Sequence, residues 1–195
     1  MVVNSVTGMM EGARYVASPN CDQRPDGKAP SLLTIHGISL PPGEYGGPWI
    51  DALFTNTLDP QAHPYFAEIH SLRVSSHLLI RRDGEWVQYV PFDKRAWHAG
   101  VSSYQGRECC NDFSIGIELE GTDDEPYEEE QYKVLAESIA ALLAVYPELS
   151  SEHICGHSDI APGRKSDPGP HFDWQHFQHL LADAVLAKRQ ASIDT

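Results

Sequence analysis

The chain has 195 residues, which is enough for one domain with a single hydrophobic core and short for two. Hydrophobic residues make up 41% of it, and its 15 Gly and 14 Pro are typical of a globular protein with several long loops. The formal net charge of −14 argues against nucleic acid or an anionic membrane surface as a partner. An acidic small substrate stays possible, because a few local cations can dominate inside a cleft.

The sequence also bears on where the protein acts. Residues 1–8 have no basic start and no sustained apolar stretch, so they do not resemble a secretory signal. No apolar run reaches the roughly 20 residues needed to span a bilayer. The cysteines show no disulfide framework and are interpreted as free thiols: Cys21, Cys109, Cys110 and Cys155. These features predict a protein of the cytoplasm.

The first predicted elements are a strand and a helix. The apolar run at residues 31–35 is typical of a buried strand that ends at His36. Residues 37–48 are rich in Gly and Pro and predict a long loop. Apolar residues then recur at helical spacing from Trp49 to Leu58, which indicates a helix.

A hairpin and a further strand are expected next. The strand-like segments 75–80 and 86–90 are joined through Asp83-Gly84, a strong hairpin signal. After a loop at residues 91–106, residues 113–120 alternate between apolar and other side chains. This alternation predicts a strand with its apolar residues on one face.

The last third predicts two helices with a short strand between them. Apolar residues from Tyr132 to Tyr146 mark an amphipathic helix that stops before Pro147. A short strand at residues 153–155 leads into a loop, and Asp173 is a candidate cap for a last helix, followed by a frayed tail at residues 191–195. The elements together predict a mixed α/β protein (α+β) with a central mixed β-sheet covered by helices.

Two of the ten histidines and one aspartate, all near strand ends, form a candidate metal site. His36 and His157 each follow a predicted strand, and Asp167 lies ten residues after His157. Strand ends are where a rigid sheet presents side chains to loops. Two imidazoles and one carboxylate, with a fourth position for water, form a common catalytic zinc arrangement. Such a zinc ion yields a hydroxide nucleophile near neutral pH.

Five motifs occur in a fixed order along the chain, and together they carry a resemblance. They are Ile35-His36, Trp97-His98-Ala99-Gly100, 115–121, 156–162 and 164–169. In this order the chain resembles the N-acetylmuramoyl-L-alanine amidase type 2 family, which is related to bacteriophage T7 lysozyme and the peptidoglycan recognition proteins. The similarity runs from about residue 18 to residue 181.

The resemblance implies a fold, an activity and a site. It implies a single zinc amidase domain over residues 1–195, with its core at about 18–188 and the fold of the proteins just named. It implies Zn²⁺ bound by three residues, His36, His157 and Asp167. Glu118 would then be the general base and acid, and Lys165 would stabilise the oxyanion.

The implied reaction is hydrolysis of the amide bond between 1,6-anhydro-N-acetylmuramic acid and L-alanine of the stem peptide, in cytoplasmic recycling of muropeptides. Tyr65 and Trp97 resemble positions that shape the cleft, and Arg73 and Arg107 could pair with stem-peptide carboxylates. A small glycopeptide is therefore the expected partner, and a monomer is the expected state. The other hypotheses are a non-catalytic peptidoglycan-binding module and an amidase of intact peptidoglycan.

Several positions keep an alternative interpretation. Glu120 competes with Glu118 for the catalytic role. The alternative for Glu118 is an exposed carboxylate on a strand, the usual role of a Glu in an alternating pattern. Cys155 is a possible ligand, because on a continuing strand it would face the same side as His157. Gly116 shares the strand face of Glu118, so it would leave room for substrate or metal.

Two further histidines, His77 and His98, could be partners of the metal ligands. The chain also departs from the family pattern at four positions: Gly37 stands where Asn is common, Gly163 where Glu is common, Ser166 where Thr is common and Cys109 where some members have Arg.

Overall fold

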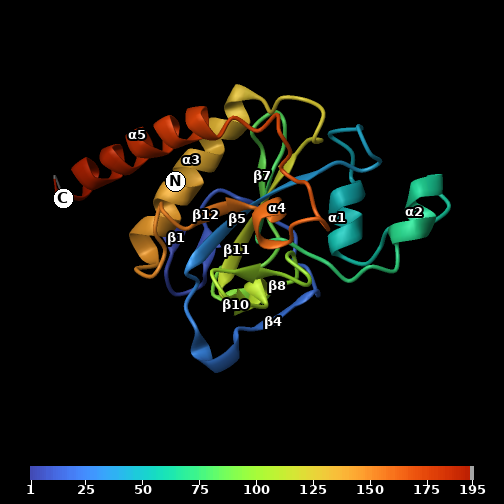
Figure 1. Ribbon diagram of the computed structural model, residues 1–195, viewed down its shortest axis with the longest axis horizontal. Coiled ribbons are helices and arrows are strands. Elements are labelled where there is room, and N and C mark those ends of the chain that lie inside the picture. The colour runs from blue at the N-terminus through green and yellow to red at the C-terminus, as the bar shows by residue number, and fades with distance from the viewer. Residues whose placement is uncertain (194–195) are drawn as a thin grey trace.

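The computed structural model describes residues 1–193, apart from the side chains of residues 26, 192 and 193. A six-stranded sheet lies at its centre, in the order β12-β5-β11-β6-β7-β3 (Figure 1). The strands in that order are Ile154–Gly156, Leu32–Ile38, Ser114–Glu120, Leu78–Ile80, Trp86–Gln88 and Arg14–Tyr15. Neighbouring strands are parallel except β6 and β7, which are antiparallel. The predicted mixed sheet is confirmed.

The hairpin of β6 and β7 follows from its turn. Gly84 has a φ of +86°, a left-handed conformation that glycine adopts without strain. Ile80 pairs with Trp86, and Leu78 with Gln88, so the two strands are in register on either side of the turn. The regular strands are shorter than predicted, because β6 begins at Leu78 and β7 ends at Gln88.

Within residues 1–193, five α-helices lie around the sheet. They are α1 Trp49–Phe54, α2 Pro64–Ile69, α3 Glu129–Val145, α4 His157–Ile160 and α5 Trp174–Ile193. A capping box begins α3, in which Gln131 Oε1 accepts the backbone N–H of Glu128 at 3.0 Å. Asp173 Oδ1 accepts the backbone N–H of His176 at 2.9 Å, so the predicted cap of the last helix is confirmed.

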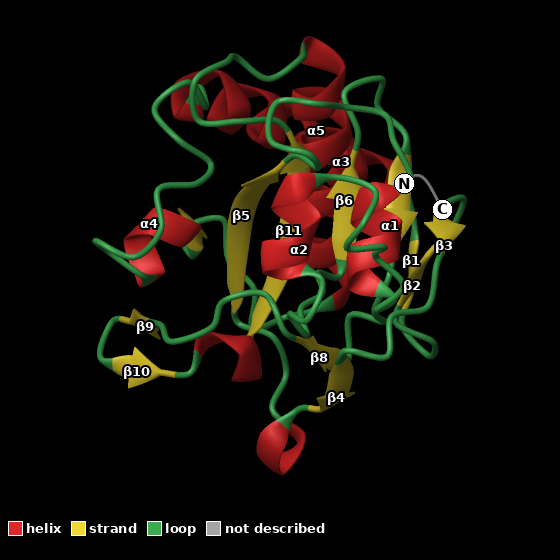
Figure 2. Ribbon diagram, turned by 90° about the vertical axis from the view of Figure 1, so that its right-hand side faces the viewer, coloured by secondary structure: helices red, strands yellow, loops and turns green. Residues whose placement is uncertain are grey.

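The two faces of the central strands differ in chemistry. Alternate apolar residues of β5 and β11 pack with α3 and α5 in one hydrophobic cluster: Leu33, Ile35, Ile115, Ile117 and Leu119. Helices α1 and α2 cover part of the opposite face around Leu79 and Val87 (Figure 2). On that second face β5 and β11 carry their small and polar residues: Thr34, His36, Ser114, Gly116 and Glu118.

Several elements were not expected from the sequence. Three two-stranded pairs lie outside the central sheet: β1 Val3–Asn4 with β2 Met9–Met10, β4 Cys21–Gln23 with β8 Lys94–Ala96, and β9 Ser103–Tyr104 with β10 Arg107–Glu108. Two 3₁₀ helices add Pro25–Gly27 and Cys110–Asp112. The short helix α2 also went unpredicted. Segments of two or three residues are too short to show a periodicity.

Four further predicted boundaries were wrong. The strand predicted to end at His36 continues to Ile38, because it stays paired with β11 through Gly37 and Ile38. The helix predicted to reach Leu58 ends at Phe54. The loop predicted from Gly156 to His171 starts later, because Gly156 still belongs to β12 and residues 157–160 form α4. The tail predicted from residue 191 is helical to Ile193, and residues 194–195 lie outside the described residues.

Among residues 1–193, none of the helices is both long enough and apolar enough to cross a membrane.

Candidate metal centre and cleft

Three predicted residues bring one ligand atom each to the same point. His36 lies near the end of β5, His157 is the first residue of α4, and Asp167 lies in the loop after α4. The Nδ1 atoms of His36 and His157 are 3.0 Å apart, and each lies 3.2 Å from Oδ2 of Asp167. Among the described residues, these three form a group that could hold a metal ion.

The spacing of these atoms fits a small cation. A point roughly 1 Å above the plane of such a triangle lies about 2 Å from each corner, which is the length of zinc–nitrogen and zinc–oxygen bonds. Hydrogen bonds alone explain the contact poorly, because all three atoms are acceptors unless an imidazole carries its proton on Nδ1. The donor set therefore fits a metal ion.

Burial puts two of these groups in metal-binding protonation states. His36 is 1% exposed, and burial lowers its pKa to about 4, so its imidazole is neutral. Burial alone would raise the pKa of Asp167, but its interactions with the imidazoles of His157 and His36 outweigh burial and hold that pKa well below its usual range. A neutral imidazole and an ionised carboxylate are the forms that ligate metals.

The sheet topology explains why these residues meet. Strands β12, β5 and β11 are parallel, so their C-terminal ends lie at one edge of the sheet. His157 follows β12 directly, and His36 on β5 pairs with Glu118 on β11. Two candidate metal ligands and a carboxylate from three distant segments are thus neighbours at one edge of the sheet.

The structure excludes Cys155 from this group of ligand atoms. The suggestion assumed a continuing strand, but β12 ends at Gly156 and His157 begins a helix. Cys155 is buried in an apolar cluster with Leu32, Phe113 and Ile160, and burial raises the pKa of its thiol to about 12. It is a packed core thiol.

A cavity of about 590 Å³ opens beside the three ligand residues. Glu118 and Lys165 both line it, as does Tyr65. Its other walls are partly apolar, with Leu40, Leu53, Ile69, Leu72 and Val74 among the lining residues. The cavity therefore joins a metal-binding group, a carboxyl and a cation to a surface that could hold a small organic substrate.

Glu118 is unlike the exposed strand carboxylate considered above. It is 8% exposed, and no described residue hydrogen-bonds its carboxyl group. Burial and the charge of Asp167 raise its pKa well above the usual value, while Lys165 opposes this shift. A carboxyl group with a raised pKa, in a cleft and without a structural partner, suits proton transfer.

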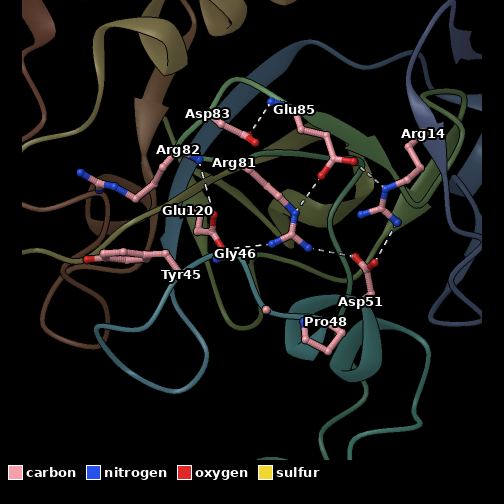
Figure 3. A pocket seen from close by; sticks show the side chains of 11 residues that line it. Arg14, Tyr45, Gly46, Pro48, Asp51, Arg81, Arg82, Asp83, Glu85 and Glu120 are labelled. Carbon is pink, nitrogen blue, oxygen red and sulfur yellow. Dashed lines mark hydrogen bonds and ion pairs between the residues drawn. The ribbon is translucent and has the colours of Figure 1, made fainter.

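Glu120, the competing carboxylate, is engaged elsewhere. Its Oε1 accepts hydrogen bonds from Arg81 Nη1 at 3.0 Å and from the backbone N–H of Gly46 at 2.8 Å. Figure 3 shows Arg81 between Glu120, Asp51 and Glu85, in a separate cavity of about 590 Å³. Because this cluster pairs its buried charges internally, Glu120 acts as a structural partner of Arg81.

Gly116 makes room for a side chain, and the expectation of substrate or metal there was wrong. A Cβ atom on Gly116 would collide with the imidazole ring of His98. His98 reaches this place from the loop after β8, and it lies against His36, with their ring centroids 5.0 Å apart. His98 is therefore a direct neighbour of a candidate ligand.

Gly37 makes room in the same way. A Cβ atom there would collide with the hydroxyl of Tyr127, a buried residue that donates a hydrogen bond to the carbonyl of Pro168 at 3.0 Å. Pro168 follows Asp167 directly. The departure from Asn at this position thus accompanies a tyrosine that fixes the segment of the third ligand.

The four predicted substrate-binding residues lie in different surroundings. Tyr65 lines the cavity beside the ligands, whereas Arg73, Trp97 and Arg107 do not. The guanidinium of Arg73 donates to the carbonyls of Ser71 and Leu72. That of Arg107 lies 3.8 Å from the ring centroid of Phe113, and Trp97 is half-buried with its backbone N–H bonded to a serine hydroxyl. Their roles toward a substrate stay predictions.

A comparison with protein families agrees with this geometry. Residues 26–170 match the model of the N-acetylmuramoyl-L-alanine amidase family. This chain belongs to that family. It is 66% identical over 175 residues to the 1,6-anhydro-N-acetylmuramyl-L-alanine amidase AmpD of Escherichia coli, an alignment that covers 90% of this chain and 95% of AmpD. AmpD of Haemophilus influenzae is 51% identical, over 87% of this chain and 92% of its own.

Solved structures show the same fold. The crystal structure of a selenomethionine derivative of AmpD matches with a TM-score of 0.90 and 64% identity, over 93% of this chain and 99% of its own. AmiD of Escherichia coli, in complex with anhydro-N-acetylmuramic acid-L-Ala-D-γ-Glu-L-Lys, matches with a TM-score of 0.57 and 29% identity, over 88% of this chain and 60% of its own. The predicted fold class and family are confirmed.

Proposed function

We propose that this chain hydrolyses the amide bond between 1,6-anhydro-N-acetylmuramic acid and L-alanine of the stem peptide, in the recycling of muropeptides. The observation that carries the proposal is the position of Glu118, unpartnered in a cleft beside three convergent metal-ligand atoms. The 66% identity to AmpD over nearly the whole chain gives the substrate class.

Zinc is the ion that the donor set favours. His36 and His157 would each bind it through Nδ1, and Asp167 through Oδ2, since these are the atoms that converge. Zinc supplies a nucleophile at neutral pH and polarises the substrate carbonyl.

The side chains around this centre would carry out the proton transfers and stabilise charge. Glu118 accepts a proton at its carboxylate from the attacking water, and then delivers it to the nitrogen of the departing L-alanine. Lys165 lines the same cavity and places a positive charge beside the oxyanion that forms at the carbonyl. Burial of Glu118 raises the pKa of its carboxyl, which makes the carboxylate a stronger base for taking up the proton.

The proposal extends to the setting of the reaction. Tyr65 and the apolar wall would pack against the sugar and its lactyl group, and an anhydromuropeptide bound to the related AmiD supports a ligand of this kind. All four cysteines are free thiols, which fits action in the reducing cytoplasm. We also propose a monomer with residues 1–195 acting as one domain.

Incubating the purified protein with an anhydromuropeptide tests the activity directly. We expect release of the free stem peptide, loss of that release after chelation, and its return when zinc is added. A folded, zinc-loaded protein that releases no peptide would contradict the enzyme and support a binding module. A strong preference for polymeric peptidoglycan would instead contradict the proposal that the substrate is a recycled anhydromuropeptide.

Two glutamine substitutions separate the catalytic carboxylate from the structural one. Glu118→Gln should keep zinc and the fold but lower turnover about 10²- to 10⁴-fold, because only the proton-transfer group is removed. Glu120→Gln should keep most turnover but lower the free energy of unfolding, because it neutralises the partner of buried Arg81. Full turnover in Glu118→Gln would show that another group moves the proton.

A further inference from the structure

A chain of buried hydrogen bonds leads away from the candidate ligand His36. Its Nε2 lies 2.9 Å from Nδ1 of His98, and Nε2 of His98 lies 3.0 Å from the hydroxyl of Ser114. That hydroxyl lies 2.6 Å from the backbone carbonyl of Cys110. All four residues are at most 9% exposed, so bulk water does not compete for these bonds.

The last member of the chain sets the direction of all the bonds. A carbonyl oxygen can only accept, so the hydroxyl of Ser114 donates its proton to Cys110. The Ser114 oxygen then accepts from Nε2–H of His98, which leaves Nδ1 of His98 as an acceptor. That acceptor requires the proton of His36 on Nε2, and Nδ1 of His36 then presents a lone pair to Asp167 and His157.

Without this chain the opposite tautomer would be favoured. Oδ2 of Asp167 lies 3.2 Å from Nδ1 of His36 and would accept a proton from it. In that tautomer the ligand nitrogen carries hydrogen and cannot bind a metal until the proton moves. The two partners of His36 therefore compete, and His98 favours the metal-ready form.

The loop that carries His98 also contacts His157, the second candidate ligand. Nε2 of His157 lies 3.2 Å from the carbonyl of Ala99, the residue after His98, and 3.5 Å from Nη2 of Arg164. The shorter contact, to an oxygen that can only accept, favours a proton on Nε2 and a lone pair on Nδ1. The side-chain oxygen of Asn111 accepts the backbone N–H groups of His98 and Ala99 at 3.1 and 2.8 Å. Arg164 donates to the same Ala99 carbonyl at 2.6 Å. The loop is thus held in place independently of the ligands.

We propose that His98 and Ser114 are positioning residues that hold His36 in its Nε2–H tautomer and so preform the metal centre. This inference rests on the proposed metal centre and deepens it. Gly116 is part of the arrangement, because any larger residue would displace the ring of His98. Outer partners of this kind change metal affinity about 10- to 100-fold when they are removed.

Two measurements test this hydrogen-bond relay, which runs from His36 through His98 and Ser114 to the carbonyl of Cys110. Long-range ¹H–¹⁵N NMR of the metal-free protein reports which nitrogen of His36 carries the proton, and competition with a chelating dye gives the zinc affinity. We expect the Nε2–H tautomer in the unaltered protein. His98→Phe keeps a ring but removes the acceptor, so the Nδ1–H tautomer should appear and zinc affinity should fall about 10- to 100-fold.

Further variants separate positioning from general stability. His98→Gln should recover most of the affinity, because its amide can accept from His36 and donate to Ser114. Ser114→Ala leaves the ring in place but frees its tautomer, and should weaken zinc binding even if His98→Phe fails to fold. His153→Gln is the matched control: His153 is a partly buried histidine whose Nδ1 lies 3.3 Å from the hydroxyl of Tyr104, away from His98 and Ser114, and its substitution should leave zinc affinity unchanged.

The relay would be overturned by an Nδ1–H tautomer of His36 in the unaltered metal-free protein, or by unchanged zinc affinity in His98→Phe and Ser114→Ala. Failure of the unaltered protein to bind zinc would instead overturn the proposed function. The tautomer, measured without metal, still decides the relay in that case.

Discussion

Gly37 and Tyr127 should behave as one unit in stability measurements. A Cβ atom on Gly37 would collide with the Tyr127 hydroxyl, whereas its next neighbours, Tyr127 Cζ at 3.6 Å and Pro168 Cα at 3.7 Å, lie at ordinary contact distances. Gly37→Ala alone therefore forces a shift in a packed interior, which costs about 1–3 kcal/mol. Tyr127→Phe alone removes the hydrogen bond to Pro168, which costs about 1 kcal/mol.

The double variant distinguishes this cause from a general loss of stability. With the hydroxyl gone, the new Cβ fits, so Gly37→Ala should add almost nothing in the Tyr127→Phe background. Independent effects would give about 2–4 kcal/mol for the double variant, whereas the structure predicts about 1 kcal/mol. Urea unfolding of the four metal-free proteins at pH 7 measures the difference. Additivity within about 0.5 kcal/mol would refute the reasoning.

Three other predictions concern pH, capping and the metal. Burial lowers the pKa of His77 to about 3, so the unfolded chain takes up a proton below pH 6.5 that the folded chain does not. Metal-free protein should thus lose about 2 kcal/mol from this residue between pH 7 and 5, and urea unfolding of His77→Gln should show a flatter pH dependence. Asp173→Ala removes the α5 cap and should cost about 0.5–2 kcal/mol, with Asp183→Ala as the uncapped control. Asp167→Ala should lower zinc occupancy by metal analysis while Glu118→Ala keeps it.

The sequence predicted the elements whose length lets a pattern show. The run before His36, the alternation at residues 113–120 and the helix of residues 129–145 each extend over at least five residues, and each is present. The turn of the hairpin was predictable because Asp83-Gly84 has a specific conformational preference. The one-turn helix that begins at His157 was not, since four residues carry no helical period.

The site was predictable to the extent that its residues are chemically distinctive. His36, His157 and Asp167 were identified and do converge. The choice between Glu118 and Glu120 could not be made from alternation, because both lie on the same strand face. It depends on Arg81, which comes from a different strand end and takes Glu120 into an ion cluster. Long-range pairing of this kind leaves no local signal in a single sequence.

Glycine positions connect the strands to the support of the ligands. Gly37 follows His36, and Gly116 lies two residues before Glu118 on the neighbouring strand. Each is in regular strand, where glycine is otherwise costly, and each admits a ring from another segment that fixes a ligand. Tyr127 fixes the segment of Asp167, and His98 fixes the tautomer of His36. Because the space for each ring exists only without a Cβ, the geometry of the candidate metal centre depends on residues outside the set of ligands.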